Sequence, residues 1–471
     1  MRESDMKKGE ITIFLSLLFV ILMAFTTGIL EAAVMQTEKN LYRLEADRAI
    51  FSIFGEYQQQ LLEEYHVFGL DGSYGTGQYS EKNIIRRMHY YGTEGLEHEI
   101  TGIQYLTDSR GQPFREQVTE YMEQKYGIGL VKDIVDMTGE WEDQSIQGEN
   151  MREKEESILD EYRELSQTTE EEETPFSCLE TIENSGILSL VLPKDMDLSG
   201  KKINLEGQAS YRALITGYGS FPARKNLNGA EEKLLFNEYI MDNFGNAADS
   251  GRDDELSEEE NGQDGKKKNK SLLYEVEYIL AGKGSDKENL ESVLFKIFLI
   301  RMSLNYVYLM GDSSRKSQAE TLAVVLSVLM FMPEIAQPLK HLILLAWAAG
   351  ESIVDLRSLL SGNRVPLIKK SENWQLPLHA LFLLGTGTDI VDGTDTQDGI
   401  SYEDYLRAFL FLENTGDVTM RTLDRTEENL KSIYGLNNFR IDYCITKLEL
   451  NTKAAVTGGL SYRFPVYFGY E

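Results

Sequence analysis

The sequence predicts a mixed α+β fold in which one N-terminal transmembrane helix continues into a stalk helix and carries a large, water-exposed domain. Three observations predict it. Residues 11–30 contain no charged side chain, apolar residues recur with helical spacing between residues 285 and 350, and alternating apolar residues run from Arg440 to Leu450. Apolar residues make up 42% of the chain, which is enough for a sizeable core.

Residues 11–30 are the predicted membrane span. Twenty residues in a helix extend about 30 Å, the thickness of the hydrocarbon core of a bilayer. Lys7 and Lys8 precede the span and Glu31 follows it, so residues 1–10 should stay in the cytoplasm while the bulk of the chain is exported. A cleaved signal peptide is the alternative, but its apolar region is usually about 7–15 residues long and ends at a small-residue cleavage site. We therefore expect an uncleaved, single-pass anchor in the cell membrane.

Residues 31–68 are predicted to extend the anchor as a stalk helix. No proline occurs in this stretch. The apolar residues Ile50, Ile53, Tyr57 and Leu61 are spaced by three or four, which places them on one face of a helix. This face is suited to packing either on the protein's own domain or on a neighbouring subunit, and it is the candidate interaction face.

The remaining chain is predicted to form two parts. Residues 69–242 make a first α+β part, with an acidic linker near residues 140–175. Residues 243–270 are nearly free of apolar side chains and predict a disordered loop. Residues 271–471 make a mainly helical second part that ends in β-strands.

Two shorter segments and one helix start have distinct local signals. Residues 187–192 and 274–280 have strand character, the second through its alternating apolar pattern. Ser285 and Glu288 form an S-x-x-E capping box that predicts the start of a long helix.

Two apolar stretches, residues 323–332 and 339–350, could be read as membrane segments or as core helices. Each is far shorter than the ~20 residues that a membrane-spanning helix needs. Charged residues lie between and within them, among them Glu334 and Lys340. We therefore expect buried core helices.

The charge balance narrows the classes of partner. Lys plus Arg number 47 against 77 Asp plus Glu, a formal charge of −30. Such a chain repels phosphates, so we expect no nucleic-acid partner. The two cysteines, Cys178 and Cys444, are too few for a disulfide scaffold. They would either form one long-range bridge or remain separate buried thiols, and the second reading is favoured.

No recognised catalytic motif occurs in the sequence, and no cofactor or metal is expected. Asp389, Asp392, Asp395 and Asp398 recur every three residues, which favours a solvated turn over a Ca²⁺ loop. Another set of polar residues falls within the apolar helices: Arg301, Asn305, Glu351 and Asp355. Paired carboxylates can act as general acid and base, but a core polar network in which Arg301 neutralises an acid is the more frequent arrangement.

Several segments together resemble a family of uncharacterised, single-pass membrane proteins of Gram-positive anaerobes, known only as a domain of unknown function. The segments are KGEITIFLSL, LEAA, EEYHVFGLD, YEVEYILAGKGSDKENL and ESIVDLRSLLSG. The resemblance implies an anchored envelope protein similar to the TadE- and TadG-like subunits of Tad pilus assembly, and it carries no catalytic residues. The chain departs from a type IV prepilin, because Glu10 follows Gly9 directly and Phe14 stands at the fifth position after it.

These observations lead us to expect a non-enzymatic, membrane-anchored extracytoplasmic protein with a structural or accessory role in pilus or envelope assembly. Its expected partners are the lipid bilayer, through residues 11–30, and other membrane or pilus-assembly proteins. The alternatives are an extracytoplasmic sensor or ligand-binding module, and a cell-wall enzyme without a known motif.

Overall fold

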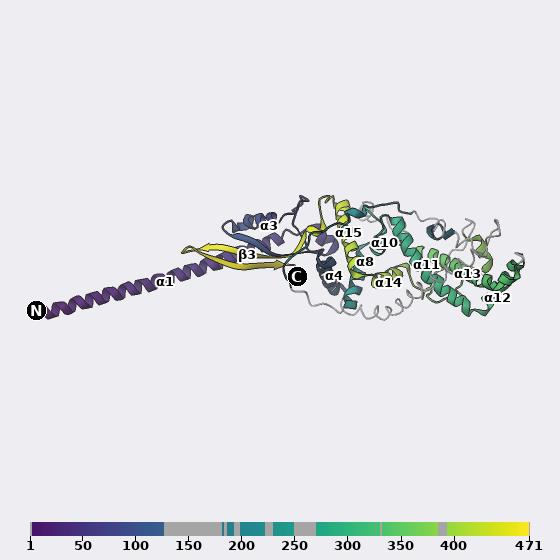
Figure 1. Ribbon diagram of the computed structural model, residues 1–471, viewed down its shortest axis with the longest axis horizontal. Coiled ribbons are helices and arrows are strands. Elements are labelled where there is room, and N and C mark those ends of the chain that lie inside the picture. Colours follow the sequence, from purple (N-terminus) through teal and green to yellow (C-terminus); the bar gives the residue numbers. More distant parts are fainter. Residues whose placement is uncertain are drawn as a thin grey trace. The chain divides into compact units, whose positions relative to one another are not determined.

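The computed structural model (Figure 1) divides into two compact units. The sheet unit comprises Met1–Gln117, Leu214–Ala223 and Leu436–Glu471, and the helical unit comprises Val118–Ala213 and Arg224–Gly435. The structure describes residues 2–126, 181–182, 186–192, 198–221, 229–248, 270–329, 332–384 and 393–470, without the side chains of residues 2–10. The predicted acidic linker, most of the predicted loop and Cys178 lie outside these residues. The class is α+β, as predicted, with an N-terminal apolar helix and C-terminal strands.

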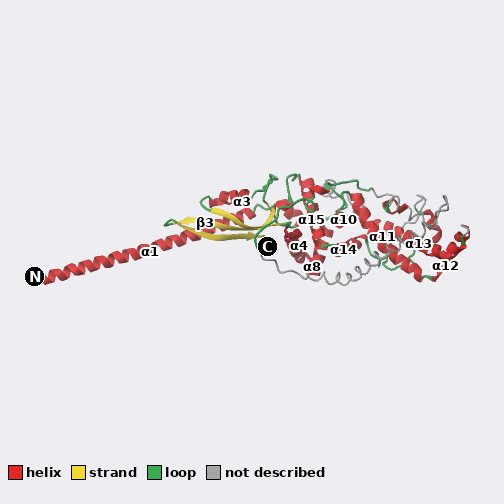
Figure 2. Cartoon of the chain, in the orientation of Figure 1, coloured by secondary structure: helices red, strands yellow, loops and turns green. Residues whose placement is uncertain are grey.

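The sheet unit combines a long helix with a four-stranded antiparallel sheet (Figure 2). The strands are β1 (Leu70–Asp71), β2 (Glu97–Tyr105), β3 (Cys444–Val456) and β4 (Leu460–Gly469). The central strand, β3, pairs with β2 along one edge and with β1 and β4 along the other. Gly458 and Gly459 both have positive φ, which lets the chain turn tightly from β3 into β4.

Helix α1 (Arg2–Phe54) covers this sheet with its C-terminal part. Ala46, Ile50, Ile53 and Phe54 join Leu448, Leu450, Phe464 and Val466 in one buried cluster. The tip of the β3–β4 hairpin is also held, because the Thr457 backbone amide donates to Glu38 Oε2 at 2.7 Å. The helix therefore contacts the rest of the unit from Glu38 onward, and its buried core residues begin at Ala46.

The observed helix ends before the stalk predicted at residues 31–68 does. Helix α1 ends at Phe54, and the short α2 (Gln59–Tyr65) follows after a break at Gly55. The unit continues with α3 (Glu81–Met88), the π-helix η1 (His89–Thr93) and α4 (Asp108–Tyr126), which crosses into the helical unit. Leu61 is nevertheless buried in the sheet unit, because it lies with Tyr65 on the buried side of α2.

The division of the chain differs from the predicted one. The terminal strands were assigned to the helical second part, but β3 pairs with β1 and β2 from the N-terminal part. Cys444 begins β3 as a buried thiol. The sheet unit is therefore discontinuous in sequence, and its two ends meet in one sheet.

The helical unit is formed by α-helices joined by short 3₁₀ turns. Its described elements are α7 (Leu188–Val191), η2 (Leu205–Gly207), α8 (Gly229–Asn243), α10 (Glu275–Ala281), α11 (Asp286–Gly311), α12 (Ser313–Leu329), η4 (Pro333–Ile335), α13 (Ala336–Leu360), η5 (Leu378–Leu383), α14 (Tyr402–Leu412) and α15 (Thr415–Tyr434). As predicted, Ser285 caps α11, with its side chain accepting from the Glu288 backbone amide.

Both predicted strands of this unit are wrong. Residues 187–192 contain α7, and residues 274–280 form most of α10. Every residue from Glu275 to Leu280 is buried, so apolar and polar side chains alternate without marking an inner and an outer face. A fully buried helix imitates a strand pattern in this way.

The two apolar stretches lie in α12 and α13. Helix α13 is buried from Leu342 to Leu356, in agreement with the prediction. Helix α12 buries Ala323 and Ser327 but leaves Val324 and Leu329 exposed. The prediction of a core helix is therefore wrong for one face of α12, whose fully buried residues Ala319, Ala323 and Ser327 are all small.

Candidate functional site

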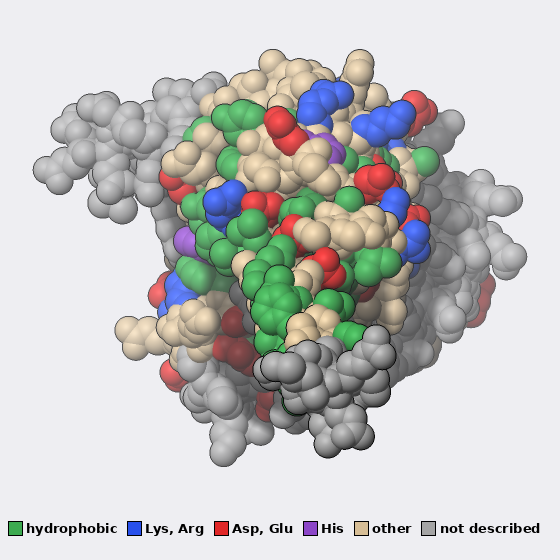
Figure 3. Space-filling model, turned by 90° about the vertical axis from the view of Figure 1, so that its left-hand side faces the viewer, with side chains coloured by type: hydrophobic (Ala, Val, Ile, Leu, Met, Phe, Trp, Pro, Cys, Tyr) green, Lys and Arg blue, Asp and Glu red, His purple; other side chains and the backbone are tan. Residues whose placement is uncertain are grey.

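The first part of α1 exposes an unbroken apolar surface. All side chains from Ile11 to Leu30 are exposed, and hydrophobic side chains gather on the face drawn in Figure 3. Two helices of the described chain are long and apolar enough to cross a membrane, Ile11–Phe54 and α11, but more than half of the most apolar stretch of α11 is buried in protein. The apolar part of α1 is thus the segment whose surface only a lipid or another apolar partner would cover.

The candidate interaction face points inward. Ile50, Ile53 and Leu61 have at most 2% of their surface exposed, while Tyr57 is 36% exposed. Ile50 and Ile53 pack against the sheet. Of the two roles predicted for this face, it packs on the protein's own domain and not on a neighbouring subunit, because Ile50 and Ile53 are already covered by the sheet.

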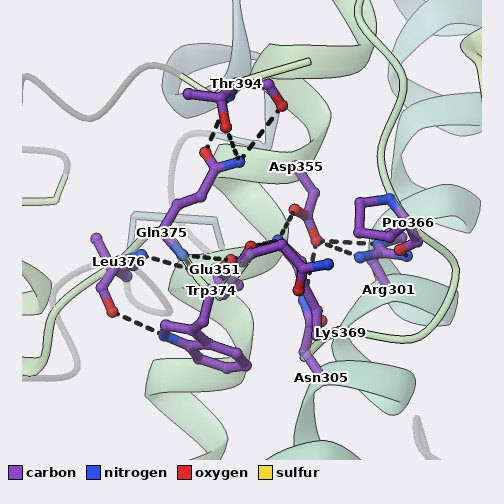
Figure 4. Close-up of polar contacts among 12 residues, drawn as sticks. Arg301, Asn305, Glu351, Asp355, Pro366, Lys369, Trp374, Gln375, Leu376 and Thr394 are labelled. Carbon is purple, nitrogen blue, oxygen red and sulfur yellow. Dashed lines mark hydrogen bonds and ion pairs between the residues drawn. The ribbon is translucent and has the colours of Figure 1, made fainter. Parts of the chain in front are cut away.

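A buried ionic network joins α11, α13 and the loop before Leu376 (Figure 4). Asp355 Oδ2 accepts hydrogen bonds from Arg301 Nε at 3.0 Å and Arg301 Nη2 at 2.7 Å. It accepts a third from Asn305 Nδ2 at 3.1 Å. On its other side, Asp355 Oδ1 lies 2.7 Å from Lys369 Nζ. Two cations and one amide therefore converge on one carboxylate.

Glu351 belongs to the same network. Lys369 Nζ donates to Glu351 Oε1 at 2.5 Å, and the Leu376 backbone amide donates to Oε2 at 2.7 Å. Arg301 Nη1 in turn donates to the Pro366 carbonyl at 2.9 Å. The structure thus brings all four sequence-selected polar residues together and adds Lys369. No spacing signal marks Lys369, although two buried acids beside a single arginine imply a second cation.

The charges of the network balance within the protein interior. Arg301, Lys369, Glu351 and Asp355 are each no more than 3% exposed. Burial alone would raise the pKa of Asp355, but the Arg301 and Lys369 charges outweigh it and hold that pKa below its usual value. Burial raises the pKa of Glu351, an effect that Lys369 only partly offsets. With its charges paired and closed to solvent, the cluster fastens the loop to α11 and α13.

A second buried network, which the sequence reasoning missed, surrounds α10 and α15. Asp424 Oδ1 accepts from the Ser210 backbone amide at 2.9 Å, and Asp424 Oδ2 accepts from the Tyr278 hydroxyl at 2.8 Å. Glu275 Oε1 accepts from Asn429 Nδ2 at 2.6 Å. Glu275 and Tyr278 belong to the segment YEVEYILAGKGSDKENL, whose first residues were predicted to form a strand.

We expect Asp424 to make the stability of the helical unit depend on pH. Burial raises its pKa from 3.8 to about 6, despite hydrogen bonds from Ser210 and the nearby Arg425 charge. The folded state then binds the proton more tightly than the unfolded state, so stability should fall as pH rises from about 4 to about 6, by on the order of 2–3 kcal/mol. Urea unfolding across this range should show a weaker decline for Asp424→Asn. The exposed Asp398→Asn is the matched control, and equal slopes for all three proteins would contradict the assignment.

The sheet unit contains a cleft of about 370 Å³ beside the start of α4. Asp108 lines this cleft, but Asp108 Oδ2 accepts from the Tyr105 amide at 2.7 Å and Oδ1 from the Gly217 amide at 2.9 Å. Both oxygens therefore hold backbone in place. Within the described residues, no group of three or more His, Cys, Asp or Glu side chains is placed to hold a metal ion.

Comparison with known proteins assigns a family without a function. Residues 165–456, more than half of the chain, match a family described as "Family of unknown function (DUF5702)". No curated protein and no solved structure matches the chain significantly. The matched range includes both buried networks and ends in β3, and it leaves out α1. The chain therefore belongs to the DUF5702 family, whose function is unknown.

Proposed function

We propose that this protein is a membrane-anchored, extracytoplasmic structural or accessory component of envelope assembly. The observation that carries the proposal is α1, whose uncovered apolar residues 11–30 continue without a break into the core of the sheet unit. A helix built in this way ties a folded domain rigidly to a bilayer.

The buried polar groups support a structural role over a catalytic one. A general acid or base must reach a substrate, directly or through one water. Asp355 and Glu351 have at most 1% of their surface exposed, and their oxygens face protein cations and amides. These contacts suit residues that fix the packing of helices.

A role beside a Tad-like or other type IV-like pilus is the finer form of the proposal. It is supported by a resemblance to anchored envelope proteins of that kind. The resemblance lies in the anchor, in the stalk and in the segment ESIVDLRSLLSG within and just after α13. A subunit of such an assembly would bind other membrane proteins through its surface and would need no cofactor.

Topology is the first test. Lys7 and Lys8 lie before the apolar residues and Glu31 lies after them, so the positive-inside rule places both units outside the cytoplasm. Protease added to intact, wall-stripped cells should digest the chain beyond about residue 35, and the anchor should resist alkaline extraction from membranes. A cytoplasmic protein probed in the same cells is the control. An ectodomain that survives together with that control would overturn the orientation, and release by alkali would overturn the anchor.

A further inference from the structure

Helix α1 carries a second apolar stripe, on the side opposite its packed face. Val34, Leu41, Leu44 and Phe51 are 42%, 50%, 65% and 66% exposed, respectively. They are spaced by seven, three and seven residues, which are the a and d positions of a heptad repeat. The buried residues Ala46, Ala49, Ile50 and Ile53 fall at positions b, c and f of the same repeat. We call the four exposed residues the outward stripe.

The bilayer does not account for the outward stripe. Leu41 lies eleven residues beyond Leu30, which corresponds to about 16 Å along a helix. Phe51 lies about 30 Å beyond it by the same measure. Its ring meets Phe468 edge-on at 5.7 Å between centroids, and this contact leaves most of the ring uncovered. An apolar stripe of this length outside the membrane calls for a protein partner.

The heptad continues through the membrane segment. Positions a and d there are occupied by Ile13, Ser16, Val20, Met23, Thr27 and Leu30. Ser16 and Thr27 are small, and their hydroxyls donate to the Ile13 and Met23 carbonyls of their own helix at 2.8 Å. They can therefore enter a helix–helix contact in lipid without an unpaired polar group, and small residues are typical of such contacts.

The charges flanking the stripe are compatible with a second, parallel copy in the same register. In such a pair, position g of one helix faces position e of the next heptad of its partner. Glu38 would face Ala33, Glu45 would face Asn40, and Asp47 would face Ser52, so no like charges would oppose one another. Arg48 occupies one a position, but its guanidinium reaches its own unit, where a Cβ atom added at Gly92 would meet Arg48 Nη2 at 3.0 Å.

We propose that the outward stripe of α1 is a pairing surface for a second copy of this chain, which forms a parallel two-helix coiled coil from the membrane segment to Phe51. The inference rests on the proposed anchoring, because a shared bilayer aligns two copies in parallel, holds them in register and raises their effective concentration. Anchoring alone would not determine which face of α1 pairs, whereas the a/d spacing of the outward stripe does.

Cysteine cross-linking in native membranes tests the pairing. The full chain carries Leu41→Cys or Leu44→Cys in a Cys178→Ser background, and Cys444 remains because it is fully buried. The control is Gln36→Cys, which is exposed but lies at position c, on the other side of the helix. Mild oxidation should give a reducible dimer of the chain with both stripe cysteines, at least about tenfold more than with Gln36→Cys, because facing a or d positions bring two Cα atoms within disulfide reach.

A second substitution separates pairing from chance collision. Adding Leu44→Glu to the Leu41→Cys chain should lower dimer yield by about tenfold, since two carboxylates would meet in the seam, while Gln36→Glu should leave it unchanged. Equal cross-linking at positions 36 and 41, no cross-linking at 41 and 44, or a product that contains a different protein would each overturn the inference. Alkaline extraction of the same membranes tests anchoring independently, so a failed pairing is distinguishable from a failed anchor.

Discussion

Replacing Asp355 with asparagine is expected to lower the free energy of unfolding of the helical unit by about 3–5 kcal/mol. Asp355 neutralises Arg301 and lies 2.7 Å from Lys369, and all three side chains are buried. The amide keeps the shape of the carboxylate but leaves an excess positive charge in a medium where charge is poorly solvated. Urea unfolding followed by tryptophan fluorescence should report the loss, because the indole N–H groups of Trp347 and Trp374 both donate to the Leu376 carbonyl, in the loop that contains Lys369.

Two further variants sharpen this experiment. Glu413→Gln removes an exposed ion pair with Lys296 and should change stability by no more than about 1 kcal/mol. The double variant Asp355→Asn/Lys369→Met removes one charge of each sign, so it should be more stable than the sum of the single effects predicts. If Asp355→Asn instead unfolds like the wild type while an envelope phenotype disappears, these acids belong to an active site and the structural reading is wrong.

Replacing Ile53 with aspartate is expected to unfold the sheet unit. Ile53 is fully buried between α1 and the sheet. The change removes a large apolar contact and places a carboxylate among Leu450, Phe464 and Val466, which together should cost more than about 4 kcal/mol. In the detergent-solubilised full chain, limited proteolysis should then cut within the strands, which the folded sheet protects.

Leu44→Asp is the matched control for Ile53→Asp. Leu44 lies on the same helix, but its side chain is 65% exposed. The charged variant should therefore leave the proteolysis pattern unchanged and should affect only the association of copies. Equal sensitivity of the two variants would mean that both faces of α1 pack within one chain, contrary to the exposure of Leu44.

The elements predicted best from the sequence are long and locally encoded. The apolar run of residues 11–30, the Ser285 capping box and the buried α13 each depend on a signal within one helix. The sequence also predicted that Arg301 neutralises one of the acids Glu351 and Asp355, because charged groups inside an apolar helix require partners.

The remaining features depend on contacts between distant residues. β3 joins the N-terminal strands across more than 300 residues of chain, and no local pattern encodes such a pairing. Helix α10 is buried on every side, so its sequence lacks the one-sided periodicity that distinguishes a helix. On α1 the sequence carries two apolar stripes, and only the position of the sheet determines that Ile53 points inward and Leu44 outward.

The uninterrupted course of α1 has a mechanical consequence. Between Glu31 and Phe54 it contains neither glycine nor proline, so no joint separates the apolar segment from the sheet. In the proposed arrangement the length of this part of the helix sets the distance between the bilayer and the sheet, and each residue adds about 1.5 Å to that distance. An insertion of seven residues would lift the sheet by about 10 Å while nearly keeping its direction, whereas four residues would lift it less and turn it by about 40°. Tilting of the anchor within the lipid would likewise rotate the whole sheet unit with it as one rigid body.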